Sequence, residues 1–140
     1  MKKQGLAILG STGSIGVQTL DIVRENPDRF EVVTLTANRN WELLARQAVE
    51  FDVDSVVIAD ETLYEPLKSA LADYPIKVFA GMKAVEYASD NSNVDVVVNA
   101  LVGYAGMLPT LRAIESGKKV ALANKESLVV GGELIMRTAL

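Results

Sequence analysis

A short apolar segment near the start of the chain leads directly into three closely spaced glycines. Residues 6–9 (Leu-Ala-Ile-Leu) are typical of a buried β-strand, and Gly10, Gly13 and Gly16 follow at once. Glycines allow a tight turn and a close backbone approach, and a helix after the turn presents unpaired N–H groups. The pattern therefore predicts a strand, turn and helix that hold a nucleotide phosphate. A plain connecting turn is the alternative, since the spacing is one residue longer than the common motif.

The rest of the chain alternates between strand-like and helix-like segments. Further strands are predicted at residues 32–36, 55–59, 77–79, 95–99 and 120–123, of which 77–79 could be an edge strand. Helices with one apolar face are predicted at residues 17–24, 42–51 and 109–116, and a helical pattern also covers residues 132–140. This alternation predicts an α/β fold of the Rossmann-like, doubly wound type, a mostly parallel sheet with helices on both faces.

Length and composition limit the function classes. A chain of 140 residues, 49% apolar and 23% charged, suffices for one globular domain. The net charge of −4 argues against a nucleic-acid partner or a membrane surface, and no apolar run reaches the ~20 residues of a membrane span. With neither cysteine nor histidine, the chain lacks thiol chemistry and the commonest general base. We expect a cytoplasmic location.

The C-terminal pattern points to a longer protein. The helical pattern at residues 132–140 stops without a glycine, asparagine or proline to close it. Helices at a domain end usually carry such a signal. We therefore expect the chain to be the leading part of a larger protein.

The loop after the second predicted strand contains Asn38, Arg39 and Asn40. In dinucleotide domains this loop meets the adenosine ribose, where an acid binds the free 2′-hydroxyl of NAD. No acid is present here, and Arg39 can instead bind the 2′-phosphate of NADP. A charge-assisted bond of ~1.5–3 kcal/mol would favour NADP roughly ten- to a hundredfold. The alternative roles are a surface charge at Arg39 and a helix cap at Asn40.

Two later loops are further candidates. Residues 99–109 contain Gly103 and Gly106, which could admit a flat ring or a pyrophosphate, or could form a tight connector. After the strand at 120–123 come Asn124, Lys125 and Glu126. Asn and Glu can bind a ribose or carboxamide, and Lys can reach a substrate anion. The alternative is a helix start capped by Asn124.

Four segments together resemble the 1-deoxy-D-xylulose 5-phosphate reductoisomerase family. They are Gly-Ser-Thr-Gly-Ser-Ile-Gly at residues 10–16, Asn-Pro at 26–27, Leu-Val-Gly-Tyr-Ala-Gly-Met-Leu-Pro-Thr-Leu at 101–111 and Leu-Ala-Asn-Lys-Glu-Ser-Leu-Val at 122–129. The glycine loop alone also suits an NADP-dependent semialdehyde dehydrogenase, but such enzymes lack the last segment. A stand-alone NADP-binding sensor is the other alternative.

The resemblance implies that residues 1–140 are the NADPH-binding domain of an oxidoreductase of non-mevalonate isoprenoid biosynthesis. That family rearranges 1-deoxyxylulose 5-phosphate, a phosphorylated ketose, and reduces the product with NADPH to 2-C-methylerythritol 4-phosphate. Its Mg²⁺ or Mn²⁺ site is an acidic cluster downstream of this region. The full-length parent is expected to be a homodimer. The fragment should thus bind NADPH, contain no catalytic or metal-binding residue, and not catalyse the reaction.

The resemblance also assigns individual residues, by their positions in the matching segments. The expected contacts of the pyrophosphate are with Gly10, Thr12, Gly13, Ser14 and Ile15. The expected contacts of the adenosine end and the 2′-phosphate are with Asn38, Arg39 and Asn40. Asn124 and Glu126 are expected on the nicotinamide side, and Lys125 is expected to reach the substrate.

Overall fold

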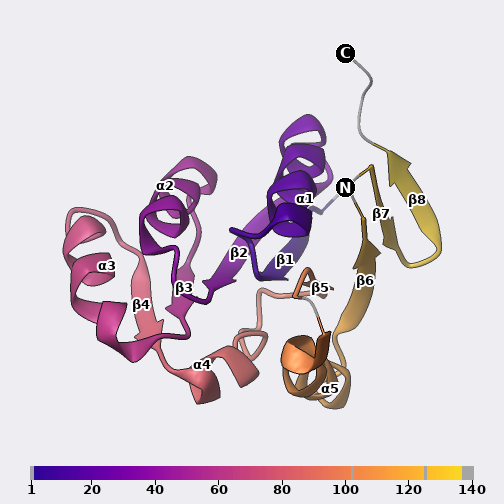
Figure 1. The fold of residues 1–140 in the computed structure, drawn as a ribbon. Coiled ribbons are helices and arrows are strands. Elements are labelled where there is room, and N and C mark those ends of the chain that lie inside the picture. Colours follow the sequence, from indigo (N-terminus) through magenta and orange to yellow (C-terminus); the bar gives the residue numbers. More distant parts are fainter. Residues whose placement is uncertain (1, 102, 125, 137–140) are drawn as a thin grey trace.

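A computed structural model describes residues 2–101, 103–124 and 126–136, which form one eight-stranded sheet (Figure 1). The strands are, in chain order, β1 (Gln4–Leu9), β2 (Phe30–Ala37), β3 (Ser55–Ile58), β4 (Lys77–Ala80), β5 (Val96–Asn99), β6 (Lys119–Ala123), β7 (Ser127–Val130) and β8 (Glu133–Met136). Their spatial order is β4-β3-β2-β1-β5-β6-β7-β8. The strands from β4 to β6 in this order pair in parallel. The β6–β7 and β7–β8 pairs are antiparallel. All six predicted strands are present, and β4 is indeed an edge strand.

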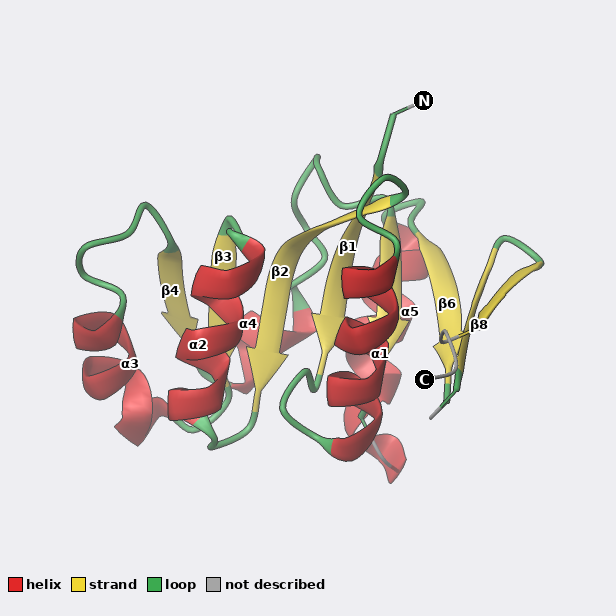
Figure 2. Cartoon of the chain, turned by 90° about the horizontal axis from the view of Figure 1, so that it is seen from above, coloured by secondary structure: helices red, strands yellow, loops and turns green. Residues whose placement is uncertain are grey.

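The helices cover both faces of this sheet (Figure 2). One face carries α1 (Ser14–Glu25), α2 (Trp41–Phe51) and α3 (Tyr64–Ala70), and the other carries α4 (Met82–Glu86) and α5 (Met107–Glu115). Short 3₁₀ turns, η1 (Glu61–Leu63) and η2 (Gly103–Gly106), precede α3 and α5. The three predicted helices that lie before residue 120 are confirmed as α1, α2 and α5. The charges from Asp60 to Glu65 are typical of a solvated helix start, and η1 and α3 begin there, whereas α4 was not predicted.

The central strand β1 explains why the fold has two cores. Along it, Leu6 and Ile8 point to the side of α1, α2 and α3, while Ala7 and Leu9 point to the side of α4 and α5. All four side chains are at most 1% exposed. A strand buried on both faces requires a continuous apolar run, which is the pattern seen in the sequence. The predicted Rossmann-like, doubly wound class is therefore confirmed.

The predicted helix at residues 132–140 is wrong where the structure describes it. Residues 133–136 form β8, which pairs with β7, and residues 137–140 lie outside the described part. Gly131 and Gly132 both have positive φ, 57° and 86°, and they form a two-residue turn of the kind that joins antiparallel strands. Ile135 is 6% exposed and packs in the core with Leu128. Strand pairing and this burial outweigh the local helical pattern.

The structure contains no described helix with the length and apolar character needed to cross a membrane.

Candidate nucleotide-binding site

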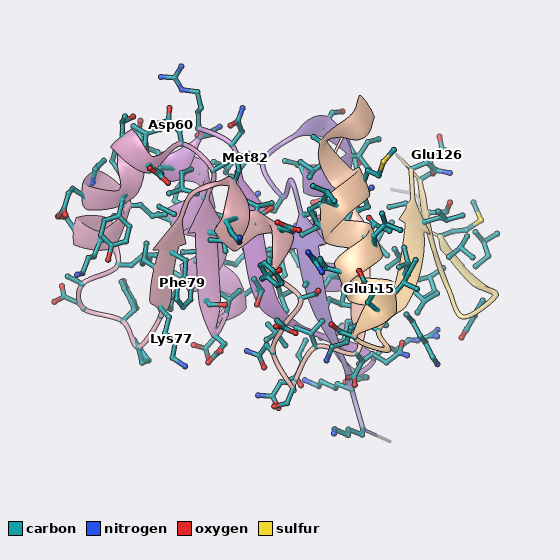
Figure 3. All side chains as sticks on the ribbon, turned by 90° about the horizontal axis from the view of Figure 1, so that it is seen from below. Asp60, Lys77, Phe79, Met82, Glu115 and Glu126 are labelled. Atoms are coloured by element: carbon teal, nitrogen blue, oxygen red, sulfur yellow. The ribbon has the colours of Figure 1, made fainter. Side chains whose placement is uncertain are left out.

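The strand order places a topological switch point beside β1. From β1 the chain builds outward through β2 and β3 to β4, and then returns to β5 on the other side of β1. In open α/β sheets, ligands bind at such a reversal, beyond the carboxyl ends of the strands. Figure 3 shows three labelled residues that follow strands, Asp60, Met82 and Glu126, at this edge, and Lys77, which begins β4, at the opposite edge. The candidate residues therefore share one edge of the sheet.

Each of the three glycines after β1 has a different structural role. Gly10 has a φ of +77°, a conformation that side-chain-bearing residues rarely adopt. At Gly16, a Cβ atom would lie 2.1 Å from the carbonyl oxygen of Gly10, so only glycine lets the helix pack against the turn. Gly13 is the N-cap of α1, and no side chain caps this helix. The predicted strand, turn and helix are thus confirmed in the described residues.

The start of α1 has the properties of an anion site. No side-chain hydrogen bond caps the helix, and its first turn holds no acidic residue. The N–H groups of a first helical turn have no partner within the helix, and the helix dipole places partial positive charge there. Gly13 and Ser14 are exposed, and Thr12 and Ile15 are partly exposed. A phosphate can therefore reach this backbone directly.

A buried polar network behind the glycine turn was missed from the sequence. Ser11 is fully buried, and its hydroxyl donates to Oε1 of Gln47 on α2 at 2.8 Å. Nε2 of Gln47 donates back to the carbonyl oxygen of Ser11 at 3.0 Å. The available signal was the position of Gln47, a polar residue on the helix face that buries Leu44 and Ala48. The partner at Ser11 could not be read from this pattern.

Asn38, Arg39 and Asn40 are all exposed in the loop after β2. The side chain of Arg39 is 73% exposed, and its Nε lies 3.3 Å from Oδ2 of Asp60. Oδ1 of Asn40 accepts a hydrogen bond from the Leu43 backbone N–H at 3.3 Å, which confirms the helix-cap interpretation of Asn40. Arg39 is therefore held at the carboxyl edge with its guanidinium open to solvent.

Asp60 is the acid that the sequence pattern around Arg39 did not include. Hydrogen bonds from the hydroxyl and the backbone N–H of Thr62 hold the pKa of Asp60 below its ordinary value, and the charge of Arg39 lowers this pKa further. Asp60 is connected to the loop by a backbone hydrogen bond from its N–H to the carbonyl oxygen of Asn38 at 3.0 Å. An ionised Asp60 thus orients Arg39 and partly neutralises it.

The loop after β5 packs against the glycine loop. A Cβ atom at Gly10 would lie 2.7 Å from Cδ2 of Leu101, so the two loops touch. Oδ1 of Asn99 accepts from the Leu101 backbone N–H at 3.0 Å. A Cβ atom at Gly106 would lie 2.3 Å from the amide atoms of Asn99. Gly106 therefore serves close packing over Asn99, which supports the tight-connector interpretation of this loop.

Asn124 forms the turn between β6 and β7. Its Oδ1 accepts from the backbone N–H groups of Glu126 and Ser127, at 2.9 and 3.0 Å, and from the Ser127 hydroxyl at 3.1 Å. The alternative of a helix start at Asn124 is wrong, because strand β7 begins at Ser127. Glu126 is exposed, and Lys125 lies outside the described residues.

The structure brings together the glycine loop and the Arg39 loop, which follow the adjacent strands β1 and β2. It places Asn124 and Glu126 at the end of β6, on the far side of β5. Within residues 2–101, 103–124 and 126–136, no three acidic side chains gather into a potential metal site. The described site can therefore hold an extended anionic ligand along the edge of the sheet.

Sequence comparison finds relatives over nearly the whole chain. The family profile described as 1-deoxy-D-xylulose 5-phosphate reductoisomerase matches residues 6–132. The reductoisomerase of Porphyromonas gingivalis is 58% identical over 137 residues, which are 98% of this chain and 36% of that protein. The reductoisomerase of Bacteroides fragilis is 52% identical over 139 residues, 99% of this chain and 36% of that protein. The chain thus spans about 36% of the length of these curated relatives.

Solved structures agree with the sequence comparison. The reductoisomerase of Zymomonas mobilis, in complex with NADPH, is 44% identical with a TM-score of 0.81; the match covers 88% of this chain and 32% of that one. A second reductoisomerase, in complex with magnesium, is 35% identical with a TM-score of 0.81, and the match covers 88% of this chain and 31% of that protein's chain.

Proposed function

The chain belongs to the 1-deoxy-D-xylulose 5-phosphate reductoisomerase family, and we propose that it is the NADPH-binding domain of such an enzyme. One observation carries this proposal. An uncapped helix follows a glycine turn at the switch point of the sheet, and an exposed arginine lies in the loop after the neighbouring strand β2. Family membership decides against a semialdehyde dehydrogenase.

The two anionic parts of NADPH fit the two loops. The pyrophosphate is assigned to the residues of the glycine loop and the first turn of α1, Gly10, Thr12, Gly13, Ser14 and Ile15. The missing side chain at Gly13 and the absence of an acid in the first turn support this assignment. The 2′-phosphate is assigned to Arg39, with Asn38 and Asn40 beside it. When bound, NADPH supplies a hydride, and the role of these residues is to bind and orient the cofactor.

The nicotinamide end is assigned to the loop after β6. Strand order supports a cofactor that extends from β2 across β1 and β5 to this loop. Because Oδ1 of Asn124 accepts three hydrogen bonds within the turn, its Nδ2 is the group that would donate to the cofactor. Glu126 is assigned to the same side, and Lys125 to the substrate.

The complete reaction is proposed for the full-length parent. That enzyme would rearrange 1-deoxyxylulose 5-phosphate and reduce the product with NADPH to 2-C-methylerythritol 4-phosphate. A related structure contains magnesium, and the parent would use Mg²⁺ or Mn²⁺. The described acids of this chain do not fit a metal centre, so we assign no metal ligand here. The parent is further proposed to be a cytoplasmic homodimer, and the 140-residue chain to bind NADPH without turnover.

The test of cofactor binding uses Trp41, the single tryptophan of the chain, which follows Arg39 by two positions. Its emission is titrated with NADPH and, separately, with NADH, and both affinities are repeated by calorimetry. A charge-assisted bond to the 2′-phosphate predicts roughly ten- to a hundredfold tighter binding of NADPH. Arg39→Met should bring the two affinities together.

Each other outcome has a clear meaning. Equal affinities in the unsubstituted chain would remove Arg39 from the 2′-phosphate site. No saturable heat or emission change with either nucleotide would overturn the proposed function. Consumption of NADPH by the purified chain with 1-deoxyxylulose 5-phosphate and Mg²⁺ would contradict the proposed lack of turnover.

A further inference from the structure

We infer that Gln47 is a positioning residue that fixes the distance between the pyrophosphate loop and the 2′-phosphate loop. The inference rests on the proposed function, because it concerns how those two loops act on one cofactor. Gln47 lies on α2 and is 6% exposed. It is not one of the residues assigned to the pyrophosphate or to the 2′-phosphate. Its effect on the cofactor would pass through Ser11.

Both polar atoms of the Gln47 side-chain amide bond to the same residue, Ser11. A buried amide is costly unless it is hydrogen bonded. Here Oε1 accepts from the Ser11 hydroxyl at 2.8 Å, and Nε2 donates to the Ser11 carbonyl oxygen at 3.0 Å. The amide thereby fixes both the side chain and the backbone of a residue inside the glycine turn. An apolar side chain would fill the same space but could not orient this backbone.

A second tether runs from the end of β2 to the same turn. The backbone N–H groups of Gly10 and Ser11 donate to the carbonyl oxygen of Thr36 at 3.1 and 2.9 Å. The Gly10 N–H also approaches Oγ1 of Thr36 at 3.0 Å, and Thr36 is 1% exposed. The glycine turn is therefore held by β2 as well as by α2.

The two residues that hold the glycine turn, Thr36 and Gln47, lie on either side of the Arg39 loop in the sequence. Thr36 precedes Arg39 by three positions, and Gln47 follows it by eight. The segment that ends β2, forms the Arg39 loop and starts α2 is thus bonded to the glycine turn on both sides. A ligand that contacts only one loop does not depend on their separation. NADP⁺ contacts both, so its affinity depends on how well the separation is fixed before binding.

The experiment compares two ligands on the 140-residue chain. NADP⁺ reaches both loops, whereas adenosine 2′-monophosphate reaches only the Arg39 loop. Gln47→Met removes both hydrogen bonds while keeping an unbranched side chain of similar size, and it should weaken NADP⁺ binding about five- to tenfold. The affinity for adenosine 2′-monophosphate should stay within about twofold, since that loop keeps its own contacts. Val49→Ala, an exposed position on the same helix, is the matched control and should change neither.

A second variant gives a readout that a general loss of stability would not produce. In Gln47→Glu, the carboxyl can accept from the Ser11 hydroxyl, but it can donate to the Ser11 carbonyl oxygen only when protonated. Burial raises the pKa of a carboxyl, so the protonated form should return as the pH falls from 8 to 5. The ratio of variant to unsubstituted dissociation constants for NADP⁺ should therefore fall toward one. The same ratio for adenosine 2′-monophosphate should stay flat.

The outcomes separate the inference from the proposed function. Unchanged NADP⁺ affinity in Gln47→Met, or an equal loss for both ligands, would overturn the positioning role while leaving the NADPH site in place. Binding of neither ligand by the unsubstituted chain would overturn the proposed function, and the inference with it. If Gln47→Met does not fold, Ser11→Ala removes one of the two bonds. It should then lower NADP⁺ affinity alone, and an unchanged affinity would contradict the inference.

Discussion

The region around the central strands β1 and β2 and the region around β6, β7 and β8 differ in how completely they are packed. Around β1 and β2, helices cover both faces, and the turns that follow these strands are held by buried hydrogen bonds. Around β6, β7 and β8, one face packs against the core through Leu128 and Ile135, while the opposite face leaves Leu122 72% and Leu134 57% exposed. The proposed phosphate contacts lie in the well-packed half around β1 and β2. There, buried hydrogen bonds to neighbouring elements fix the geometry of the turn after β1.

The exposed apolar surface continues from these strands onto α5. Met107, Leu108, Leu111 and Ile114 are each about half exposed, at 48% to 57%. The spacing of Met107, Leu111 and Ile114 places these side chains on one face of the helix. Among the described residues, this half of the domain therefore buries its apolar side chains less completely than the half around β1.

The largest expected effect is a difference in stability between two leucines in the two regions. Leu6 in β1 is fully buried, and Leu122 in β6 is 72% exposed. Leu6→Ala should lower the free energy of unfolding by about 2–5 kcal/mol through lost burial and a cavity. Leu122→Ala should change it by less than about 0.5 kcal/mol. Urea denaturation of both variants measures the difference, and equal losses would abolish the distinction between the two regions.

A second contrast uses glycines from the two regions. A Cβ atom at Gly16 would meet backbone atoms of Gly10 and Ser11 at 2.1 and 2.6 Å, so Gly16→Ala must displace the glycine turn, at a cost of about 1–3 kcal/mol. A Cβ atom at Gly132 would meet nothing within 4 Å, and Gly132→Ala would cost only the positive φ, roughly 1–2 kcal/mol.

The two glycine variants should differ most in cofactor binding. NADPH affinity, measured by calorimetry on folded protein, should be lost in Gly16→Ala and kept in Gly132→Ala. Retained binding in Gly16→Ala would show that the turn tolerates displacement, and the packing argument for the phosphate site would be wrong.

The smallest expected effect concerns the ion pair that joins the two regions. Arg29 precedes β2, and its Nη2 lies 2.6 Å from Oε2 of Glu133 at the start of β8. The hydrogen bond from Arg29 and then its charge hold the pKa of Glu133 below its ordinary value. The same hydrogen bond, and the negative charge of Glu133, raise the pKa of Arg29. Because the pKa of Glu133 is lower in the folded state, this pair stabilises the fold above the unfolded-state pKa. That contribution is lost as the pH falls through the folded-state pKa.

Carbon-13 NMR titration of the Glu133 carboxyl tests this linkage. Its pKa should lie below the ordinary glutamate value and should rise in Arg29→Met. An ordinary pKa in the unsubstituted chain would mean that β8 is not held beside Arg29 in solution.

Much of the well-packed half could be predicted because its signals are local. The apolar run at β1, the glycines after it and the capping of α2 by Asn40 depend on neighbours in the sequence. The extent of α3 and the whole of α4 were not predicted, because seven and five residues give little periodicity. The contact of Gln47 with Ser11 crosses 36 positions, and only the folded chain brings the two together.

The C-terminal edge was predicted less well because its structure depends on pairing. Residues 133–136 contain adjacent apolar residues that fit one turn of a helix as well as a strand. Residues 133–136 become a strand because they pair with the free edge of β7, and a local sequence pattern carries no information about that edge. The glycine pair at residues 131–132 was the available signal for an antiparallel turn.

We propose that one NADPH molecule occupies the glycine loop and the Arg39 loop together. The most direct test of this proposal is a titration of the nitrogen-15-labelled chain with NADPH, followed by backbone amide chemical shifts. We expect large, saturable shifts at residues 10–16 and 38–41 with the same dissociation constant at both. With NADH, the shifts at residues 38–41 should be reduced. Shifts confined to one of the two loops, or centred elsewhere on the sheet, would contradict the proposal.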